Sequence, residues 1–371
     1  MRVALAILLV VHALIHLMGF AKAFELARAP QLTMPISRTM GLVWLAAAMV
    51  LVGSSAALFA APRWFWLLAI AGAIVSQAAI VTSWHDARFG TAANVLALVA
   101  GVHGAFASRP FGLRAEYEAS TALHVARLTR LTATPPVTES ELAPLPPLVQ
   151  RYLRYAGVVG RPHVQGFRAR FTGRIRSGPS APWMPFTGEQ HNFTEPKTRL
   201  FSMQATTRGL PVDGLHSYDE SGARMRVKVL SLVSVVDAKG PDFTRTETVT
   251  LFNDMCVMAP ATLLDPTIRW RTLDASSVEG TFTNGPHTIR AVLVFDDAGA
   301  LVNFWSDDRP ALAPDGVTFV PQRWSTPLRD YRERGGVRLA SRGEARYAAP
   351  EGEYAYLELD GLDVSYDPRS P

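Results

Sequence analysis

The chain has a single cysteine in 371 residues, Cys256. One cysteine excludes an internal disulfide framework and any cysteine-rich metal site. It leaves the compartment open, because many exported proteins also lack disulfides. A nucleophilic cysteine needs a neighbouring histidine, and the helix predicted around Cys256 contains none. The sequence therefore predicts a buried thiol that acts as a small apolar side chain.

Motifs of familiar enzyme classes are absent as well. There is no Gly-x-Ser-x-Gly elbow, no glycine pattern of a phosphate-binding loop and no His-Glu-x-x-His helix. The sequence therefore gives no motif from which an activity could be assigned.

Acidic residues are scarce at the beginning of the chain. Residues 1–110 hold seven Lys or Arg but only two acids, Glu25 and Asp86, a net charge of +5. The whole chain holds 37 basic and 32 acidic residues, so residues 111–371 hold 30 of each and have no net charge. We expect no nucleic-acid partner, because such a partner needs a basic surface on the soluble domain.

Four apolar runs follow one another in residues 1–110, each with about the 20 residues that a membrane-spanning helix needs. They cover Val3–Ala21, Gly41–Ala61, Trp64–Thr82 and Phe89–Ala107. The first run also has features of a signal peptide, but its two histidines and the three later runs favour a retained helix. We expect an integral, multi-pass membrane protein. The flanking basic residues divide four against four, so the side of the membrane that carries the soluble domain is undetermined.

Polar side chains inside these runs are the unusual feature, because their burial in lipid is costly. His12 and His16 share one helix face at i, i+4, and His103 lies in the fourth run with Asn94. One interpretation is a metal or haem site, or a proton relay, that uses the three histidines. The other is hydrogen bonding between helices, which needs the same residue types.

The rest of the chain divides into a connection and a soluble domain. In residues 111–147 we expect a juxtamembrane helix over 113–131 and a proline-rich linker over 132–147. Residues 148–371 should form the soluble domain. A short amphipathic helix over 147–156 should end at Gly157. From His163 the apolar residues recur with period two, and turn signals such as Asn284-Gly285 separate the stretches. About ten strands exceed what a flat sheet holds comfortably, so we predict a curved antiparallel half-barrel in an α + β protein.

One segment of the soluble domain lacks the strand pattern. Residues 242–264 follow Gly240-Pro241 and carry an apolar face typical of a helix. Asp242 or Thr244 can be its N-cap, and Glu247 completes a capping box if Thr244 is the cap. We expect this helix, interrupted at Pro260, to pack on the concave face of the sheet or to plug it.

A curved antiparallel sheet with an inserted helix resembles the outer-membrane lipoprotein carrier architecture, and residues 330–339 look like its late hairpin. Residues from about 145 to 366 further resemble a bacterial membrane-protein family of unknown function. The motifs that carry this resemblance are Leu251–Cys256 with Ala259-Pro260, Ser306–Arg309, and Arg323–Pro327. The resemblance implies the fold and a location in the bacterial plasma membrane, and it implies no activity.

The candidate ligand-binding residues of the soluble domain come from the same motifs. They are Asn253, Asp254, Asp307, Arg309, Arg323 and Trp324. Asn253 and Asp254 are poor helix formers among apolar neighbours, and the Asp307 segment follows a predicted strand, where loop chemistry is common. They predict a polar cluster at the mouth of the half-barrel. The alternative is a buried salt-bridge network between helix and sheet, with Arg323 bidentate to a carboxylate.

Three functions follow from these predictions. The first is a membrane-tethered, non-enzymatic binding module for a lipid or another apolar ligand, because curved sheets enclose apolar pockets. The second is a membrane enzyme or redox protein that holds a metal or haem at the intramembrane histidines. A metal and a haem are the only cofactors that the sequence suggests. The third is an assembly protein that binds another membrane protein. Membrane lipids are the partner common to all three.

Overall fold

The computed structural model describes residues 2–107, 112–128, 134–313, 315 and 318–367. The chain forms two compact units, one of Met1–Ala115 with Leu230–Leu232 and one of the remaining residues. The domain boundary predicted at residue 110, the end of the juxtamembrane helix at residue 131 and the start of the linker at residue 132 lie outside the described residues.

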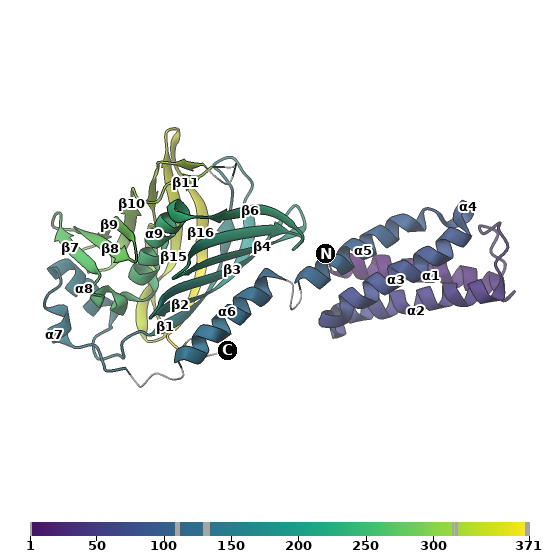
Figure 1. Cartoon of the computed structure of the whole chain (residues 1–371), viewed down its shortest axis with the longest axis horizontal. Coiled ribbons are helices and arrows are strands. Elements are labelled where there is room, and N and C mark those ends of the chain that lie inside the picture. The colour runs from purple at the N-terminus through teal and green to yellow at the C-terminus, as the bar shows by residue number, and fades with distance from the viewer. Residues whose placement is uncertain (1, 108–111, 129–133, 314, 316–317, 368–371) are drawn as a thin grey trace. The chain divides into compact units, whose positions relative to one another are not determined.

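Four helices of the first unit are long and apolar enough to cross a membrane. They are α1 (Arg2–Ala23), α2 (Arg38–Ala60), α3 (Pro62–Thr82) and α5 (Gly90–Ala107), and the short α4 (Trp84–Ala87) precedes α5 (Figure 1). Ser37 caps α2 by accepting a hydrogen bond from the Met40 N–H at 3.2 Å. Pro62 begins α3, where its missing N–H is not needed. The four apolar runs are therefore confirmed as helices.

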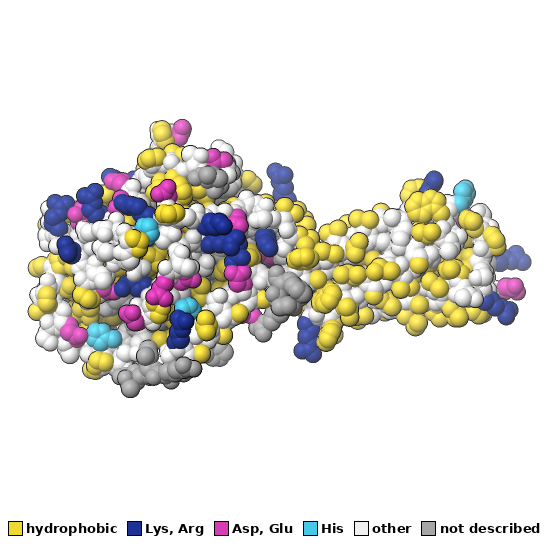
Figure 2. All heavy atoms as spheres, in the orientation of Figure 1, with side chains coloured by type: hydrophobic (Ala, Val, Ile, Leu, Met, Phe, Trp, Pro, Cys, Tyr) yellow, Lys and Arg dark blue, Asp and Glu magenta, His cyan; other side chains and the backbone are white. Residues whose placement is uncertain are grey.

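Apolar side chains cover the outside of these helices (Figure 2). Leu14 and Ile74, for example, are more than half exposed. Small residues allow close packing inside, since a Cβ added to Gly19 would collide with the Trp44 ring. An apolar exterior of this extent suits a lipid surrounding.

The second unit is built on one large antiparallel sheet. Its 14 strands in the described residues have the order β6-β5-β4-β3-β2-β1-β16-β15-β13-β10-β9-β8-β7, with β14 paired to β15 off this path. The strands are β1 (Gly166–Ile175), β2 (Met184–Thr194), β3 (Lys197–Thr207), β4 (Leu210–Asp219), β5 (Gly222–Val229), β6 (Val233–Lys239), β7 (Ile268–Thr272), β8 (Ser277–Asn284), β9 (His287–Phe295), β10 (Leu301–Ser306), β13 (Arg323–Ser325), β14 (Leu328–Arg334), β15 (Val337–Ala349) and β16 (Gly352–Ser365). A separate pair, β11 (Ala311–Leu312) and β12 (Phe319–Val320), lies outside it. The count exceeds the predicted ten.

The sheet curves around one helix, α9 (Pro241–Met258) (Figure 1). This helix contacts β5 and β6 on one side and β9 and β10 on the other, strands that lie far apart in the sheet order. The edges β6 and β7 do not pair, so the sheet remains an open half-barrel. The predicted α + β fold, apolar helices followed by a curved antiparallel sheet with an inserted helix, is confirmed.

Helix α9 begins earlier than the predicted capping box requires. Gly240, with φ of 112°, is the N-cap and Pro241 the first helical residue, whereas Thr244 lies within the helix and donates to the Gly240 carbonyl at 2.9 Å. Glu247 consequently points elsewhere, and the capping box is wrong. Pro260 ends the helix as predicted, and a 3-10 turn, η1 (Pro260–Leu264), follows.

The remaining helices are α6 (Leu113–Leu128), α7 (Glu139–Leu142) and α8 (Pro147–Ala156). The predicted amphipathic helix is confirmed in α8, which buries Tyr152 and Leu153 and ends at Gly157 with φ of 77°. The Tyr152 hydroxyl donates to the Cys256 carbonyl at 2.7 Å, which links α8 to α9.

Candidate functional site

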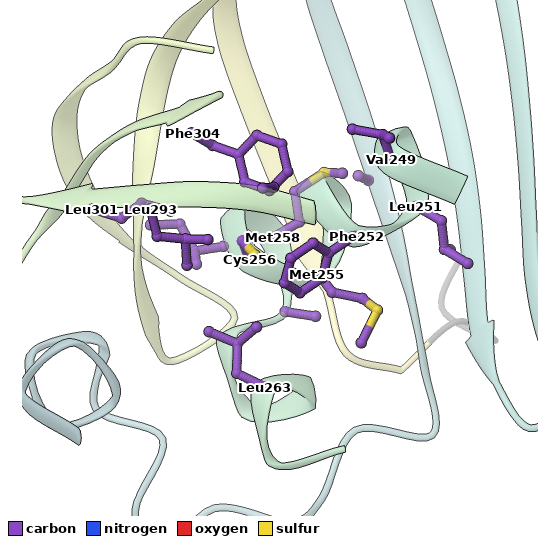
Figure 3. Close-up of a cluster of buried hydrophobic side chains, with 14 of the residues drawn as sticks. Val249, Leu251, Phe252, Met255, Cys256, Met258, Leu263, Leu293, Leu301 and Phe304 are labelled. Atoms are coloured by element: carbon purple, nitrogen blue, oxygen red, sulfur yellow. The ribbon is translucent and has the colours of Figure 1, made fainter. Parts of the chain in front are cut away.

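One side of α9 is apolar and packs on the strands β8 to β10. The Phe252 ring lies 5.7 Å from the Phe304 ring, measured between centroids (Figure 3). The corresponding distance to the Phe282 ring is 5.2 Å. Met255 and Cys256 lie in the same cluster, and Cys256 is fully buried. This wall of the half-barrel is apolar, and its thiol has a raised pKa because of burial. The predicted buried, apolar role of Cys256 agrees with this environment.

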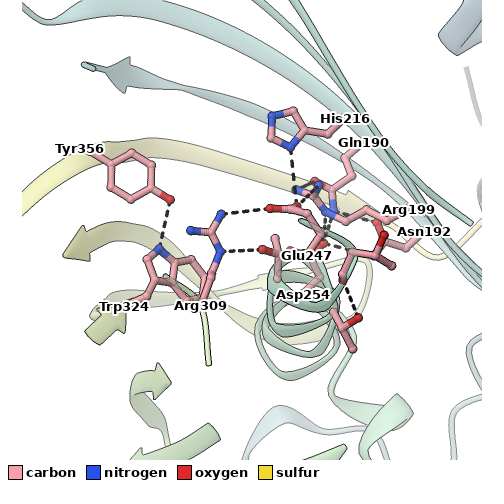
Figure 4. A network of polar contacts seen from close by, with 12 residues as sticks. Gln190, Asn192, Arg199, His216, Glu247, Asp254, Arg309, Trp324 and Tyr356 are labelled. Carbon is pink, nitrogen blue, oxygen red and sulfur yellow. Dashed lines mark hydrogen bonds and ion pairs between the residues drawn. The ribbon is translucent and has the colours of Figure 1, made fainter. Parts of the chain in front are cut away.

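The other side of α9 carries charge. Glu247 and Asp254 are seven residues apart, two helical turns, so they share one face. Arg199 of β3 lies between them: its Nε is 2.7 Å from Asp254 Oδ2, and its Nη1 is 3.7 Å from Glu247 Oε2 (Figure 4). One guanidinium therefore joins both carboxylates of the helix to the sheet.

Strand register explains why these polar side chains meet α9. Asn192 of β2 is the direct ladder partner of Arg199, and Gln190 points to the same face two residues earlier. Gln190 Nε2 and Asn192 Nδ2 donate to Asp254 Oδ2 at 2.7 and 3.3 Å. The Asp254 oxygen thus receives three donors, all from neighbouring strands.

Arg309, which follows β10, approaches α9 from the opposite part of the sheet. Its Nε donates to Thr250 Oγ1 at 2.8 Å, and its Nη2 lies 3.3 Å from Glu247 Oε1. The guanidinium lies over the Trp324 indole, with 4.5 Å between Cζ and the ring centroid (Figure 4). It also donates to the Tyr347 hydroxyl. The Trp324 ring and the Glu247 carboxylate therefore hold the guanidinium in position.

The charges of this buried network balance, with two guanidiniums and two carboxylates. Burial by itself raises the pKa of Glu247, but the guanidiniums of Arg309 and Arg199 outweigh it and lower the pKa to about 2. Burial lowers the pKa of His216, whose Nδ1 lies 3.7 Å from Glu247 Oε2 without a hydrogen bond. At neutral pH the network therefore contains a carboxylate at Glu247 and a neutral imidazole.

The six candidate residues do not all meet. Asp254, Arg309 and Trp324 belong to the buried network. Asn253 donates to Thr326 Oγ1 at 2.7 Å instead. Asp307 and Arg323 form the predicted bidentate pair, at 2.9 and 3.0 Å, but their side chains are more than half exposed, so this pair is a surface contact.

Sequence reasoning missed several members of the network. They are Gln190, Asn192, Arg199, His216, Glu247 and Tyr347. On a strand of alternating pattern a polar residue is expected to face water. Gln190 and Asn192 share one face of β2, and nothing in the sequence indicates that a helix covers this face.

The intramembrane histidines form a second cluster within the first unit. The Nε2 atoms of His12 and His16 both approach Ser76 Oγ, at 3.0 and 2.7 Å. His12 Nε2 also lies 3.0 Å from Asn94 Oδ1, and Asn94 Nδ2 donates to Gln77 at 2.8 Å. The cluster links α1, α3 and α5 through side chains in the apolar interior.

His103 does not join this cluster. It follows Asn94 by nine residues on α5, about 13 Å along the helix. In the parts of the chain that the structure describes, no group of three His, Cys, Asp or Glu side chains is arranged to hold a metal ion. The predicted set of three histidines is therefore not assembled. His12 and His16 form hydrogen bonds between helices instead.

The family model for DUF6544, a family of unknown function, matches residues 135–359. The chain belongs to this family. The matched DUF6544 region contains α8, α9 and all of the sheet except the end of β16. It therefore includes both the apolar cluster and the charged network described above. No curated protein matches the chain.

Solved structures with a similar fold have low identity. One is described as an outer membrane lipoprotein-sorting protein domain from Vibrio parahaemolyticus, with TM-score 0.34, 10% identity, and coverage of 54% of this chain and 85% of that chain. A DUF1329 family protein from Desulfovibrio piger has TM-score 0.33, 13% identity and coverage of 59% and 90%. A LolA superfamily protein from Nitrosomonas europaea has TM-score 0.29, 10% identity and coverage of 59% and 90%. Likeness at this level carries no functional argument.

Proposed function

We propose that the protein is an integral, multi-pass membrane protein of the bacterial plasma membrane whose sheet domain binds a lipid or another apolar ligand inside the half-barrel. The four apolar helices supply the anchor. The binding site is the concave face of the sheet, and α9 occupies that face when no ligand is bound. Its function is binding, without a chemical reaction.

The observation that carries this proposal is that α9 contacts two unlike groups of side chains. Phe282 and Phe304 form an apolar group on β8 and β10. Arg199 of β3 and Arg309, which follows β10, pair with the carboxylates on the charged face of the helix. An amphiphile needs this combination, an apolar surface for its chain and hydrogen-bond donors for its head.

Binding requires α9 to move, because its side chains fill the concave face. The helix is docked partly through ion pairs, and taking each ion out of water costs several kcal/mol. Attraction between the partners offsets part of that cost, so the charged side of α9 is held less firmly than an apolar side of the same area. A ligand whose head pairs with Arg199 and Arg309 would replace Glu247 and Asp254 at those positions.

Two measurements on the purified full chain in detergent test the proposal. Lipid extraction followed by mass spectrometry detects a bound lipid. The rate at which a maleimide labels Cys256 then reports whether α9 leaves the concave face, because Cys256 is the only cysteine and is fully buried when the helix is in place. Adding the recovered lipid to delipidated protein should accelerate labelling several-fold, and a Cys256→Ser variant should remain unlabelled.

The results can contradict the proposal directly. Protein that carries no lipid after purification, together with Cys256 labelling that no added phospholipid accelerates, would show that the concave face is a closed core. In that case α9 and its charges serve only to stabilise the fold.

A further inference from the structure

The sheet has a pocket whose lining shares no residue with the network around α9. It has a volume of about 470 Å³ and is formed by β1, β14, β15 and β16. Arg170 and Thr172 of β1 line it and are exposed, whereas Phe171 between them is buried in the core. Side chains alternate between the two faces of a strand, so Arg170 and Thr172 point to the face opposite Phe171.

Local backbone geometry makes the hollow. The ladder between β1 and β16 shifts between Thr172 and Gly173, and Asp360 is the extra residue of the bulge. Next to it, Gly361 lies opposite Thr172 and has no side chain; a Cβ there would lie 2.8 Å from Thr172 Oγ1. A bulge followed by a glycine leaves space in the sheet surface that a regular ladder would fill.

Arginine dominates the lining of this pocket. Arg170, Arg332, Arg334 and Arg342 contribute four guanidiniums, and Asp360 and Asp363 contribute two carboxylates. Arg332 and Arg334 are two residues apart on β14 and therefore point to the same side. The formal charge of the lining is 4 − 2 = +2.

These guanidiniums are poorly neutralised by the protein. Arg170 lies 3.9 Å from Glu189, and Arg342 lies 3.5 Å from Asp330, both longer than a close, hydrogen-bonded ion pair. Arg334 Nε donates to a backbone carbonyl, that of Leu362, at 3.1 Å. Among the described residues, neither Arg332 nor the two pocket aspartates form an ion pair within 4 Å.

We propose that this pocket binds a phosphate monoester group. Such a group carries a charge of about −1.5 to −2 at neutral pH, which matches the +2 of the lining, and offers three acceptor oxygens. The planar fork of arginine suits phosphate oxygens, which accept two parallel N–H donors. The same chemistry occurs in the head of phosphatidic acid and in soluble phosphate esters.

Isothermal titration calorimetry on the full chain in phosphate-free detergent solution tests the site. The probes are inorganic phosphate and glycerol 3-phosphate, with sulfate as a competitor. Wild-type protein should bind glycerol 3-phosphate, and Arg332→Ala and Arg170→Ala should each weaken binding by at least about tenfold, as the loss of a hydrogen bond to a charged group implies. Arg332→Lys should fall between wild type and Arg332→Ala. Arg269→Ala, an exposed arginine on β7 outside the pocket, should bind as wild type does.

A second arm distinguishes the source of the phosphate. Mixed micelles of detergent with phosphatidic acid, compared with micelles containing phosphatidylcholine, present the group on a lipid. Binding of phosphatidic acid more than tenfold tighter than glycerol 3-phosphate assigns a lipid head; equal affinity assigns a soluble ester. Either outcome supports the site. Wild-type protein that binds neither probe, or Arg170→Ala and Arg332→Ala variants that bind as wild type does, would overturn it.

This test is independent of the proposed lipid site in the half-barrel. Labelling of Cys256 reports the concave face, whereas Arg170 and Arg332 lie outside the network around α9. Failure of one proposal therefore leaves the other measurable.

Discussion

The Nε atom of Arg199 lies 2.7 Å from Oδ2 of Asp254, and neither side chain is more than 8% exposed. The pair joins the beginning of β3 to the last third of the helix that fills the half-barrel. Removal of one partner from such a pair leaves a buried charge without compensation, which is far more costly than the loss of an exposed pair. The first two predictions concern this network.

Replacing Arg199 with methionine should lower the free energy of unfolding of the sheet domain by about 3–5 kcal/mol, because both Asp254 and Glu247 lose their shared partner. Urea unfolding of the full chain in detergent, followed by tryptophan fluorescence, measures the loss. The matched control is Arg224→Met, which removes an exposed pair with Asp237 at 2.7 Å and should cost about 1 kcal/mol or less. Equal losses in the two variants would contradict a buried, uncompensated charge.

Acid should weaken the fold through Glu247. Its pKa is lowered from 4.5 to about 2 in the folded protein, so its ionised form stabilises the fold above pH 4.5, and this contribution is lost as the pH falls through 2. The difference in unfolding free energy between wild type and Glu247→Gln should therefore be constant above about pH 5. It should shrink by about 3 kcal/mol as the solution is acidified to about pH 2. A difference that does not change with pH would show that folding does not lower the pKa of Glu247.

Local patterns were sufficient to predict a curved antiparallel sheet, although not its number of strands. The Asp219–Gly222 and Asn284-Gly285 turns mark the hairpins β4–β5 and β8–β9, and Gly222 and Gly285 have positive φ, at 117° and 55°, as these turns require. The helix α9 was also predictable, because an apolar face at helical spacing follows a Gly-Pro boundary. These features depend on residues close together in the chain.

The site was only half predictable, because its other half depends on curvature. Asp254 drew attention as a carboxylate among apolar helix residues. Arg199 did not, since a charged residue on an alternating strand normally faces water. Only the closure of β2 and β3 over α9 turns that face inward, and no local pattern encodes this. The opposite error occurred at Asp307, which is conspicuous in sequence but lies in an exposed pair.

A methyl group added under the helix should destabilise its apolar side. Gly280 of β8 lies directly below Phe252, and a Cβ there would be 2.7 Å from Phe252 Cζ and 3.0 Å from the Trp270 ring. Gly280→Ala should therefore displace α9, lower the free energy of unfolding by about 1–3 kcal/mol and accelerate maleimide labelling of Cys256. Gly178→Ala is the control, because nothing lies within 4 Å of a Cβ at that position. Unchanged labelling in Gly280→Ala would mean that α9 can shift without exposing its thiol.

Two buried serines of the apolar helices provide a matched test of the histidine cluster. Ser76 Oγ is within hydrogen-bond distance of both His12 and His16, whereas Ser54 Oγ is equally buried and has no partner. Ser76→Ala should destabilise the helix bundle by about 0.6–2 kcal/mol, because two imidazoles lose a partner in an apolar surrounding. Ser54→Ala should be neutral or slightly stabilising, since it removes an unsatisfied hydroxyl. Unfolding of the full chain by dodecyl sulfate, followed by the loss of helical circular dichroism, compares the two. If Ser76→Ala is as stable as Ser54→Ala, the histidines do not hold the helices together, and the metal, haem and proton-relay interpretations of His12 and His16 become the ones to test.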